Sequence, residues 1–251
     1  RFAVGTVEEA RQLRENGFED EEILMLRSTV DREELEQLVD LNVVCTVSSV
    51  DTGLALNAVA ENRSTVAEAH IQVDTGLGFG GFLAGEPEKI LLAYRSLPNV
   101  ALSGIYTQLH AVSLKDNEVG RQLDQFGQIL DAIHQAGFET GMVHAAGSFA
   151  LMHFDAARLD AVRAGSAILG RCRRTSGDGL KTVGYGQAPI TEVRWLPKGH
   201  TVGAGKLVTL KRPTRVAVLP VGYQNGFGVG RARDAGLWAT LRRWRSAKKQ
   251  T

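Results

Sequence analysis

The sequence predicts an α/β protein, namely a (β/α)8 TIM-type barrel that lacks its first βα unit and is followed by an incomplete β domain. Two observations support this prediction. Short apolar runs alternate with helical patterns, as in a parallel sheet covered by helices. After about residue 186 the helical patterns stop and only strand-like runs follow. We therefore expect a barrel domain over residues 1–186 and the start of a β domain over residues 187–251.

The barrel domain should contain seven strands, separated by about 20–35 residues. The expected strands are Phe2–Gly5, Ile23–Leu26, Val43–Val47, Ala69–Asp74, Leu102–Thr107, Gly141–Ala145 and Asp160–Ala164. Eight strands close such a barrel, so seven indicate that one unit is absent. A doubly wound sheet is the rival fold, but it needs a glycine-rich turn after its first strand. Gly5-Thr6-Val7 does not supply one.

Between these strands, apolar residues recur at helical spacing. The expected helices are Val7–Asn16, Asp31–Leu41, Thr52–Asn62, Pro87–Leu97 and Glu118–Ala136. Two of them begin with a capping pattern, in which Thr6 or Asp31 is followed three residues later by Glu9 or Glu34. These patterns predict where the first two helices start.

Three strand-like runs, separated by turns that contain proline, follow the barrel domain. They are Ile190–Trp195, Val202–Val208 and Arg215–Val221. Residue 1 is Arg and already adjoins a strand-like run, and the last residues follow a basic helical stretch, Leu241–Lys249. We therefore expect both ends to have been cut from a longer protein.

The composition excludes several classes of function. Lys and Arg number 29 against 28 Asp and Glu, so no overall charge favours nucleic acid or an anionic membrane. No apolar run approaches the roughly 20 residues of a membrane span, and no leader opens the chain. We expect a cytoplasmic protein, with the basic cluster Arg242–Lys249 on a solvated helix face. Cys45 and Cys172 predict neither a metal site nor a disulfide scaffold.

Four stretches together resemble the alanine racemases. They are Val73–Gly78, His144–Ser148, Val162–Gly170 and Pro220–Gly226. Phe2–Ala10 also resembles the second strand and helix of that family. Each motif alone is weak, but their order and spacing are fairly specific and they span nearly the whole chain.

The resemblance implies a barrel that holds pyridoxal phosphate, a following β domain and a homodimer. It also implies a small amino acid as substrate, because the family interconverts L- and D-alanine in D-alanine metabolism. The cofactor acts as the electron sink for this reaction. Two bases on opposite faces of the substrate carbon then remove and return the proton. In the family these are the Schiff-base lysine and a tyrosine of the second subunit.

Neither of these two bases has a counterpart in the sequence. The lysine belongs to a motif close to V-K-A-N-A-Y-G at the end of the first barrel strand, and none of the eight lysines ends an expected barrel strand. The V-G-Y-G motif of the tyrosine is matched by Val202–Gly205, which carries Ala204. Val183–Gly186 has the right letters but comes too early, which argues against a catalytic Tyr185. We therefore assign no catalytic residue.

Other positions also depart from the family. Phe79 replaces an arginine near the phenolic oxygen of the cofactor, Gln108 replaces a histidine against its ring, and Gly147 replaces an asparagine. His110 lies on the same strand face as Gln108, so it is either a substitute or a solvated loop histidine.

Part of the cofactor site is retained. Arg163 matches the arginine that pairs with the pyridine nitrogen, which stays unprotonated beside a group that can only donate. Ser148, Gly165 and Ser166 match the phosphate-binding positions, and His144 ends a strand beside them. The alternatives are a structural ion pair for Arg163, turn and cap chemistry for the serines and glycine, and a structural role for His144.

Three hypotheses follow. The chain is part of an alanine racemase-like enzyme, a non-catalytic barrel that binds pyridoxal phosphate or phosphate, or a structural remnant without ligand. We favour the first and expect the 251 residues alone to be inactive, because both proton-transfer groups are absent. No metal is expected.

Overall fold

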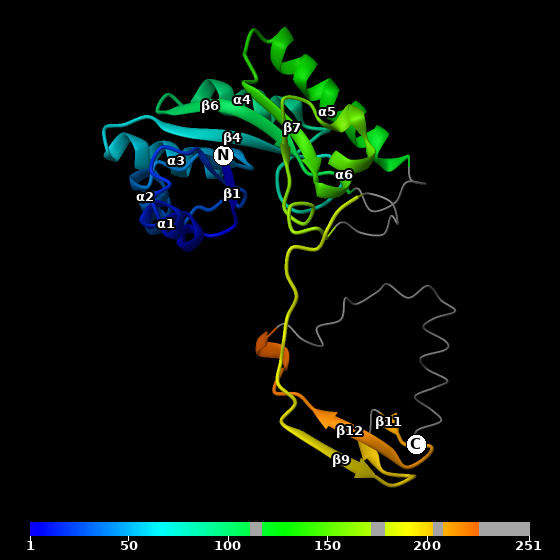
Figure 1. Ribbon diagram of the computed structural model, residues 1–251. Helices are drawn as coiled ribbons and strands as arrows, with labels where there is room; N and C mark the ends of the chain where they lie inside the picture. Colours follow the sequence, from blue (N-terminus) through cyan, green and yellow to red (C-terminus); the bar gives the residue numbers. More distant parts are fainter. Residues whose placement is uncertain (111–116, 172–178, 203–207, 226–251) are drawn as a thin grey trace. The chain divides into compact units, whose positions relative to one another are not determined.

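The chain divides into two structural units, Arg1–Gly184 and Tyr185–Thr251. The computed structural model describes residues 1–110, 117–171, 179–202 and 208–225 (Figure 1). The sequence predicts the domain boundary after residue 186, close to this division.

Parallel strands form the sheet of the first unit. In spatial order they are β1 (Phe2–Val4), β2 (Ile23–Met25), β3 (Cys45–Val47), β4 (Ala67–Asp74), β6 (Val100–Thr107), β7 (Met142–Gly147) and β8 (Ala161–Arg163). A parallel bridge between Leu24 and Val44 joins β2 to the strand that follows it. Among the described residues no pairing joins β8 to β1, so the sheet has an open edge there. All seven predicted barrel strands are confirmed, with shifted ends.

Helices alternate with these strands as predicted. They are α1 (Val7–Glu15), α2 (Arg32–Asp40), α3 (Val50–Asn62), α4 (Pro87–Ser96) and α5 (Glu118–Gln135), and Figure 1 shows α4 and α5 beside β6 and β7. The Thr6 hydroxyl accepts the Glu9 N–H at 3.2 Å, and the Asp31 carboxylate accepts the Glu34 N–H at 2.9 Å. Three short elements were not predicted: β5 (Phe82–Leu83), α6 (Ser148–His153) and η1 (Asp155–Ala157).

The described part of the first unit is held together by a small apolar cluster around α6 and by a large one that joins the sheet to the long helices. Ile71 and Ile105 contribute to it from neighbouring strands, while Phe126 and Ile133 contribute from the inner face of α5. Burial of such side chains stabilises the fold by roughly 1.5–3 kcal/mol each. The strands are all parallel, so this packing brings their carboxyl ends to one edge of the sheet, where polar side chains of different strands meet.

Within its described residues, the second unit contains two antiparallel strand pairs. β9 (Glu192–Leu196) pairs with β12 (Thr214–Val218), and β10 (Thr201–Val202) pairs with β11 (Val208–Thr209); η2 covers Tyr223–Asn225. The single predicted strand Val202–Val208 is therefore wrong, because its two ends belong to strands that run in opposite directions. Gly203 and Gly205 lie between those ends in the sequence, and glycine weakens a continuous strand.

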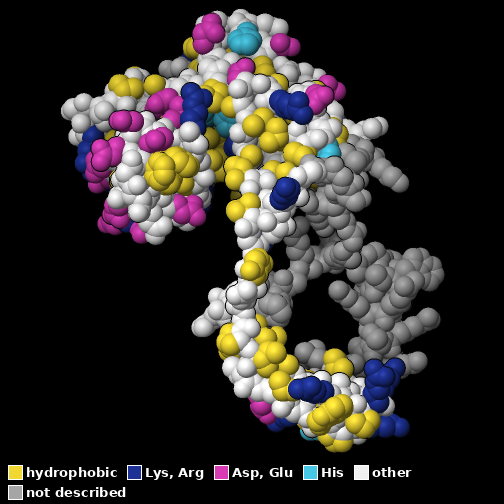
Figure 2. Space-filling view, viewed as in Figure 1, with side chains coloured by type: hydrophobic (Ala, Val, Ile, Leu, Met, Phe, Trp, Pro, Cys, Tyr) yellow, Lys and Arg dark blue, Asp and Glu magenta, His cyan; other side chains and the backbone are white. Residues whose placement is uncertain are grey.

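Charged side chains cover the helical surface of the first unit. Figure 2 shows acidic groups gathered over α1 and α2, where Glu8 and Glu36 form ion pairs with Arg11 and Arg32. Exposed pairs of this kind contribute little to stability. Within the described part of the chain, no helix has both the length and the hydrophobicity to cross a membrane.

Candidate cofactor-binding site

The last residues of β7 and β8 lie side by side and carry the candidate site. Gly147 pairs with Arg163 in the sheet register, and Ser148 begins α6 directly after β7. This pairing places the loop after β8 next to Ser148. It explains why residues 15 or more positions apart in the sequence meet at one edge of the sheet.

Arg163 is half-buried and makes several polar contacts. Its guanidinium donates to His144 Nδ1, to the carbonyl of Thr107 at 2.8 Å and to the carbonyl of Ala145 at 3.4 Å. It also lies over the ring of Tyr106, 5.0 Å from the ring centroid. These hydrogen bonds use three of the five N–H groups of an arginine. The other two have no partner among the described residues.

His144 and His70 form a buried pair inside the sheet. His144 Nε2 lies 3.0 Å from His70 Nδ1, and each residue is 2% exposed. Burial, with the positive charge of Arg163, lowers the pKa of His144 to about 2. Burial lowers the pKa of His70 to about 4. Both rings are therefore neutral at neutral pH. The ring of Tyr106 stacks on His144 with 4.9 Å between the ring centroids.

Ser148 joins the two loops of the site. Its hydroxyl oxygen accepts the N–H of Gly165 at 3.0 Å and the N–H of Ala167 at 3.1 Å. Two backbone amides thus converge on one oxygen atom. The space at Gly165 is open, because a Cβ added there would meet no atom within 4 Å. Ser166 is exposed and its carbonyl accepts the N–H of Arg171 at 2.7 Å.

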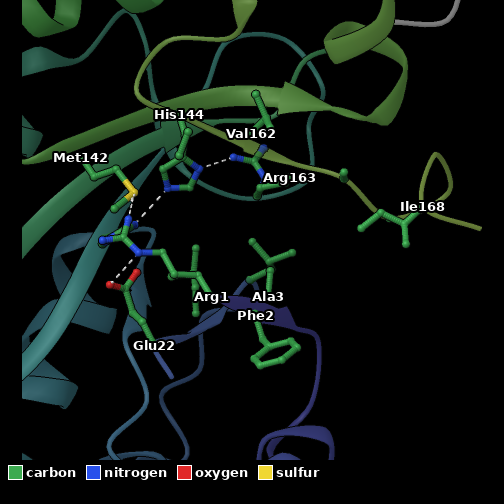
Figure 3. A pocket seen from close by; sticks show the side chains of 15 residues that line it. Arg1, Phe2, Ala3, Glu22, Met142, His144, Val162, Arg163 and Ile168 are labelled. Carbon is green, nitrogen blue, oxygen red and sulfur yellow. Dashed lines mark hydrogen bonds and ion pairs between the residues drawn. The ribbon is translucent and has the colours of Figure 1, made fainter. Parts of the chain in front are cut away.

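A cavity of about 520 Å³ adjoins Arg163 and runs along the open edge between β8 and β1. His70, His144 and Gly165 line it together with the first residues of the chain. Figure 3 shows the guanidinium of Arg163 directed at His144 on one side of this cavity. Solvent or a ligand can therefore reach the site from the cavity.

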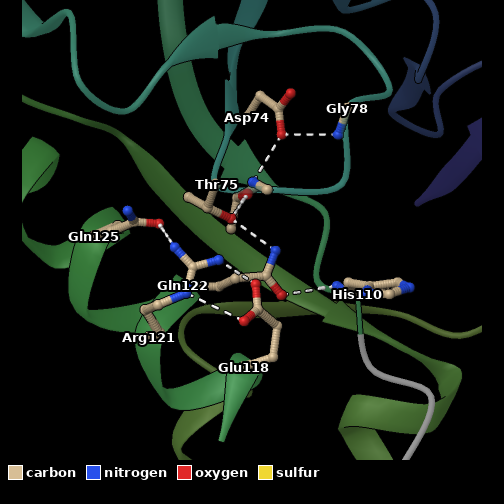
Figure 4. A network of polar contacts seen from close by, with 10 residues as sticks. Asp74, Thr75, Gly78, His110, Glu118, Arg121, Gln122 and Gln125 are labelled. Atoms are coloured by element: carbon tan, nitrogen blue, oxygen red, sulfur yellow. Dashed lines mark hydrogen bonds and ion pairs between the residues drawn. The ribbon is translucent and has the colours of Figure 1, made fainter. Parts of the chain in front are cut away.

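A second polar network stabilises the loops after β4 and β6 (Figure 4). The buried side chain of Gln122 donates to Thr75 Oγ1 at 3.2 Å and accepts the N–H of His110 at 2.9 Å. Thr75 and Thr107 share a hydrogen bond of 2.8 Å. Asp74 accepts the N–H of Gly76 and of Gly78 at 2.8 and 3.1 Å, so it holds its own loop. His110 takes part in this network through its backbone, and its ring points away from Gln122.

The structure thus brings Arg163 together with His144 and Ser148 together with Gly165, while among the described residues the Ser166 side chain hydrogen-bonds to neither pair. Sequence reasoning missed His70, Tyr106 and Gln122. A detectable signal existed for Gln122, because it is the one polar member of the otherwise apolar buried face of α5. His70 and Gln72 are likewise polar residues in the buried part of β4, on the face opposite to Ala69, Ile71 and Val73.

Most of the described positions that differ from the family motifs lie in exposed loops. Phe79 is 74% exposed in the loop after β4, and its carbonyl accepts the Gln72 side-chain N–H at 3.3 Å. Gln108 is exposed, and Gly147 is the N-cap residue of α6. Tyr185 is 81% exposed and belongs to the second unit. Ala204 lies outside the described residues.

The residues present fit a phosphorylated pyridine ring. Arg163 offers two unused N–H groups, and a ring nitrogen with one lone pair can accept one of them. Ser148 Oγ accepts two backbone amides, which leaves its hydroxyl hydrogen as a donor for a phosphate oxygen.

Comparison with known proteins identifies the family. Residues 1–172 match the family model "Alanine racemase, N-terminal domain", and residues 183–242 match "Alanine racemase, C-terminal domain". The alanine racemase of Carboxydothermus hydrogenoformans is 31% identical over 232 residues, and that of Halothermothrix orenii is 29% identical over 233 residues. Each alignment covers 90% of this chain and 62% or 60% of the relative, so the chain spans about 60% of the length of these curated relatives.

Solved structures agree with this assignment. The alanine racemase of Clostridium difficile 630 superposes with a TM-score of 0.73 at 25% identity, covering 90% of this chain and 60% of the other. The alanine racemase of Bartonella henselae, with covalently bound pyridoxal phosphate, superposes with a TM-score of 0.73 at 23% identity, covering 90% and 62%. Both the resemblance found in the sequence and the predicted fold class are confirmed.

Proposed function

We propose, on the premise that this chain belongs to the alanine racemase family, that it forms the cofactor-binding part of an enzyme that interconverts L- and D-alanine with pyridoxal phosphate. One observation supports the proposal: Arg163, with two unused N–H groups, lies at the same edge of the sheet as the loop after β8, whose amides converge on Ser148. By analogy with the family, the whole protein works in the cytoplasm as a homodimer on a small amino acid.

When bound, pyridoxal phosphate supplies an electron sink for the carbanion formed at the substrate carbon. Arg163 binds the ring nitrogen as a donor and, having no acceptor lone pair, leaves it unprotonated. This weakens the electron sink, which suits racemisation without side reactions. The neutral His144 accepts from Arg163 and orients its guanidinium.

The loop after β8 binds the phosphate. Ser148 donates its hydroxyl hydrogen, and Gly165 lets the backbone approach closely because it has no side chain. Ser166 is exposed on the same loop and would donate its hydroxyl to the phosphate. His144, the fifth residue of the proposed set, acts through Arg163, because both of its ring nitrogens are already hydrogen-bonded.

The two proton-transfer groups are the part that this chain does not supply. No described lysine lies at the end of a barrel strand; these are Lys89 in α4 and Lys181, Lys198 and Lys211 in non-strand segments. We therefore propose that the 251 residues alone bind the cofactor but do not racemise alanine.

Titration of the purified chain with pyridoxal phosphate, followed by absorbance, tests the binding. We expect saturable binding that weakens about tenfold in Ser148→Ala, the effect of losing one hydrogen bond to a charged group. A smaller effect is expected for Ser166→Ala, and none for Ser96→Ala at the end of α4. Unchanged binding in both Ser148→Ala and Ser166→Ala would remove the reason for the assignment. Chiral analysis of alanine tests activity, and any interconversion by the purified chain would contradict the proposed inactivity.

A further inference from the structure

The contacts of Arg163, His144 and His70 have a defined direction. Arginine can only donate, so the nitrogen of His144 that faces it, Nδ1, must accept. A neutral imidazole carries its single proton on the other nitrogen, so His144 Nε2 donates to His70 Nδ1 across 3.0 Å. His70 must then carry its own proton on Nε2. The hydrogen bonds therefore all run in one direction, with Arg163 donating to His144 and His144 donating to His70.

The ring of His70 packs against Gly104, in the space that a side chain at position 104 would fill. The two residues are paired neighbours on β6 and β4. A Cβ added to Gly104 would lie 2.5–2.7 Å from three ring atoms of His70, which is closer than atoms can pack. The imidazole thus packs directly against the backbone of β6. Glycine inside a strand weakens it, so the close approach of this ring explains why a glycine stands here.

We propose that His70, seated on Gly104, is a positioning residue for the ring-nitrogen contact of Arg163. By accepting the Nε2–H of His144, His70 holds His144 in the tautomer that accepts from Arg163. Arg163 is then fixed on one side by His144 and on the other by the Thr107 carbonyl. Its two remaining N–H groups are left for the ligand. This inference rests on the proposed function, because the ligand is pyridoxal phosphate.

Nitrogen-15 NMR of the chain labelled in histidine tests the direction of the hydrogen bonds without any ligand. We expect the signals of His144 and His70 at neutral pH to show an unprotonated Nδ1 and a protonated Nε2. A His144 that is protonated on Nδ1, or on both nitrogens, would overturn the inference.

Ligand selectivity tests the positioning role. The affinity for pyridoxal phosphate is compared with that for the analogue that has C–H in place of the ring nitrogen. The wild type should prefer pyridoxal phosphate by about tenfold, the effect of one hydrogen bond from a charged donor. His70→Leu, which has no acceptor, and Gly104→Ala, which displaces the ring, should abolish this preference and leave the affinity for inorganic phosphate unchanged.

Two further variants separate positioning from general structural damage. His70→Asn keeps an acceptor oxygen near the former Nδ1 and should restore the preference. Ser103→Ala changes the residue next to Gly104 in β6 and should behave as the wild type. If His70→Leu does not fold, Gly104→Ala decides the question. If the wild type prefers pyridoxal phosphate and both His70→Leu and Gly104→Ala keep this preference, the inference is overturned but the proposed function is not. A wild type that binds neither ligand overturns the proposed function and the inference with it.

Discussion

Lowering the pH from about 7.5 to about 5 should reduce the free energy of unfolding of the first unit by about 4 kcal/mol through His70 and His144. In the folded state burial lowers the pKa of these histidines to about 4 and about 2. In the unfolded chain both return to about 6.5, so the unfolded state binds more protons below that pH. Stability is therefore fully present above pH 6.5 and falls as the pH drops. Each histidine contributes about 2 kcal/mol over this range, because one pH unit corresponds to about 1.4 kcal/mol.

Urea unfolding followed by circular dichroism at several pH values measures this effect. The range ends at about pH 5 to stay above the ordinary range of carboxyl groups. His70→Asn removes one titrating ring and keeps an acceptor for His144, so it should halve the pH-dependent loss. His134→Asn, at an exposed position in the last turn of α5, is the matched control and should follow the wild type. A loss of the same size in His70→Asn and in the wild type would refute the reasoning.

Three further predictions, for Gly141, Gln122 and Asp31, test other parts of the structure, each by urea unfolding against the wild type. Gly141→Ala puts a Cβ 2.0 Å from a carbonyl oxygen of β6 at a residue with φ +64, so it should lower the free energy of unfolding by more than about 3 kcal/mol. The control Gly137→Ala also has a positive φ, +82, but its Cβ meets no atom within 4 Å, so it should lower the free energy of unfolding by about 1 kcal/mol. Equal losses would contradict the packing at Gly141. Gln122→Leu should cost about 2 kcal/mol and speed hydrogen exchange at the His110 amide, and an unchanged exchange rate there would rule out this contact. Asp31→Ala should cost about 1 kcal/mol through loss of the α2 cap, and no change would show that the cap does not stabilise the helix.

The sequence predicted the barrel strands and the five long helices well, because apolar periodicity and capping residues are local signals. Asp31 is an example, since its side chain caps α2 as its spacing to Glu34 indicates. The predicted strand Val202–Val208 was wrong because the period of its apolar residues carries no information about chain direction. The short α6 was missed because it has too few residues to show a helical period.

The candidate site was predictable only where residues match the motifs of the family. Those motifs gave Arg163 and Ser148, and the structure adds the contacts that surround them. His70 and Gly104 could not be paired from the sequence, because they lie on different strands and the parallel register that joins them is set by packing of the whole sheet. Whether Ser166 binds a phosphate stays a prediction.

A crystal structure of the chain with pyridoxal phosphate tests the central proposal most directly. We predict that the phosphate accepts the hydroxyl hydrogen of Ser148 beside Gly165, and that the ring nitrogen faces Arg163. The hydrogen bond between Arg163 and His144 should remain. A cofactor bound elsewhere on the barrel, or one whose phosphate rather than ring nitrogen contacts Arg163, would contradict the account.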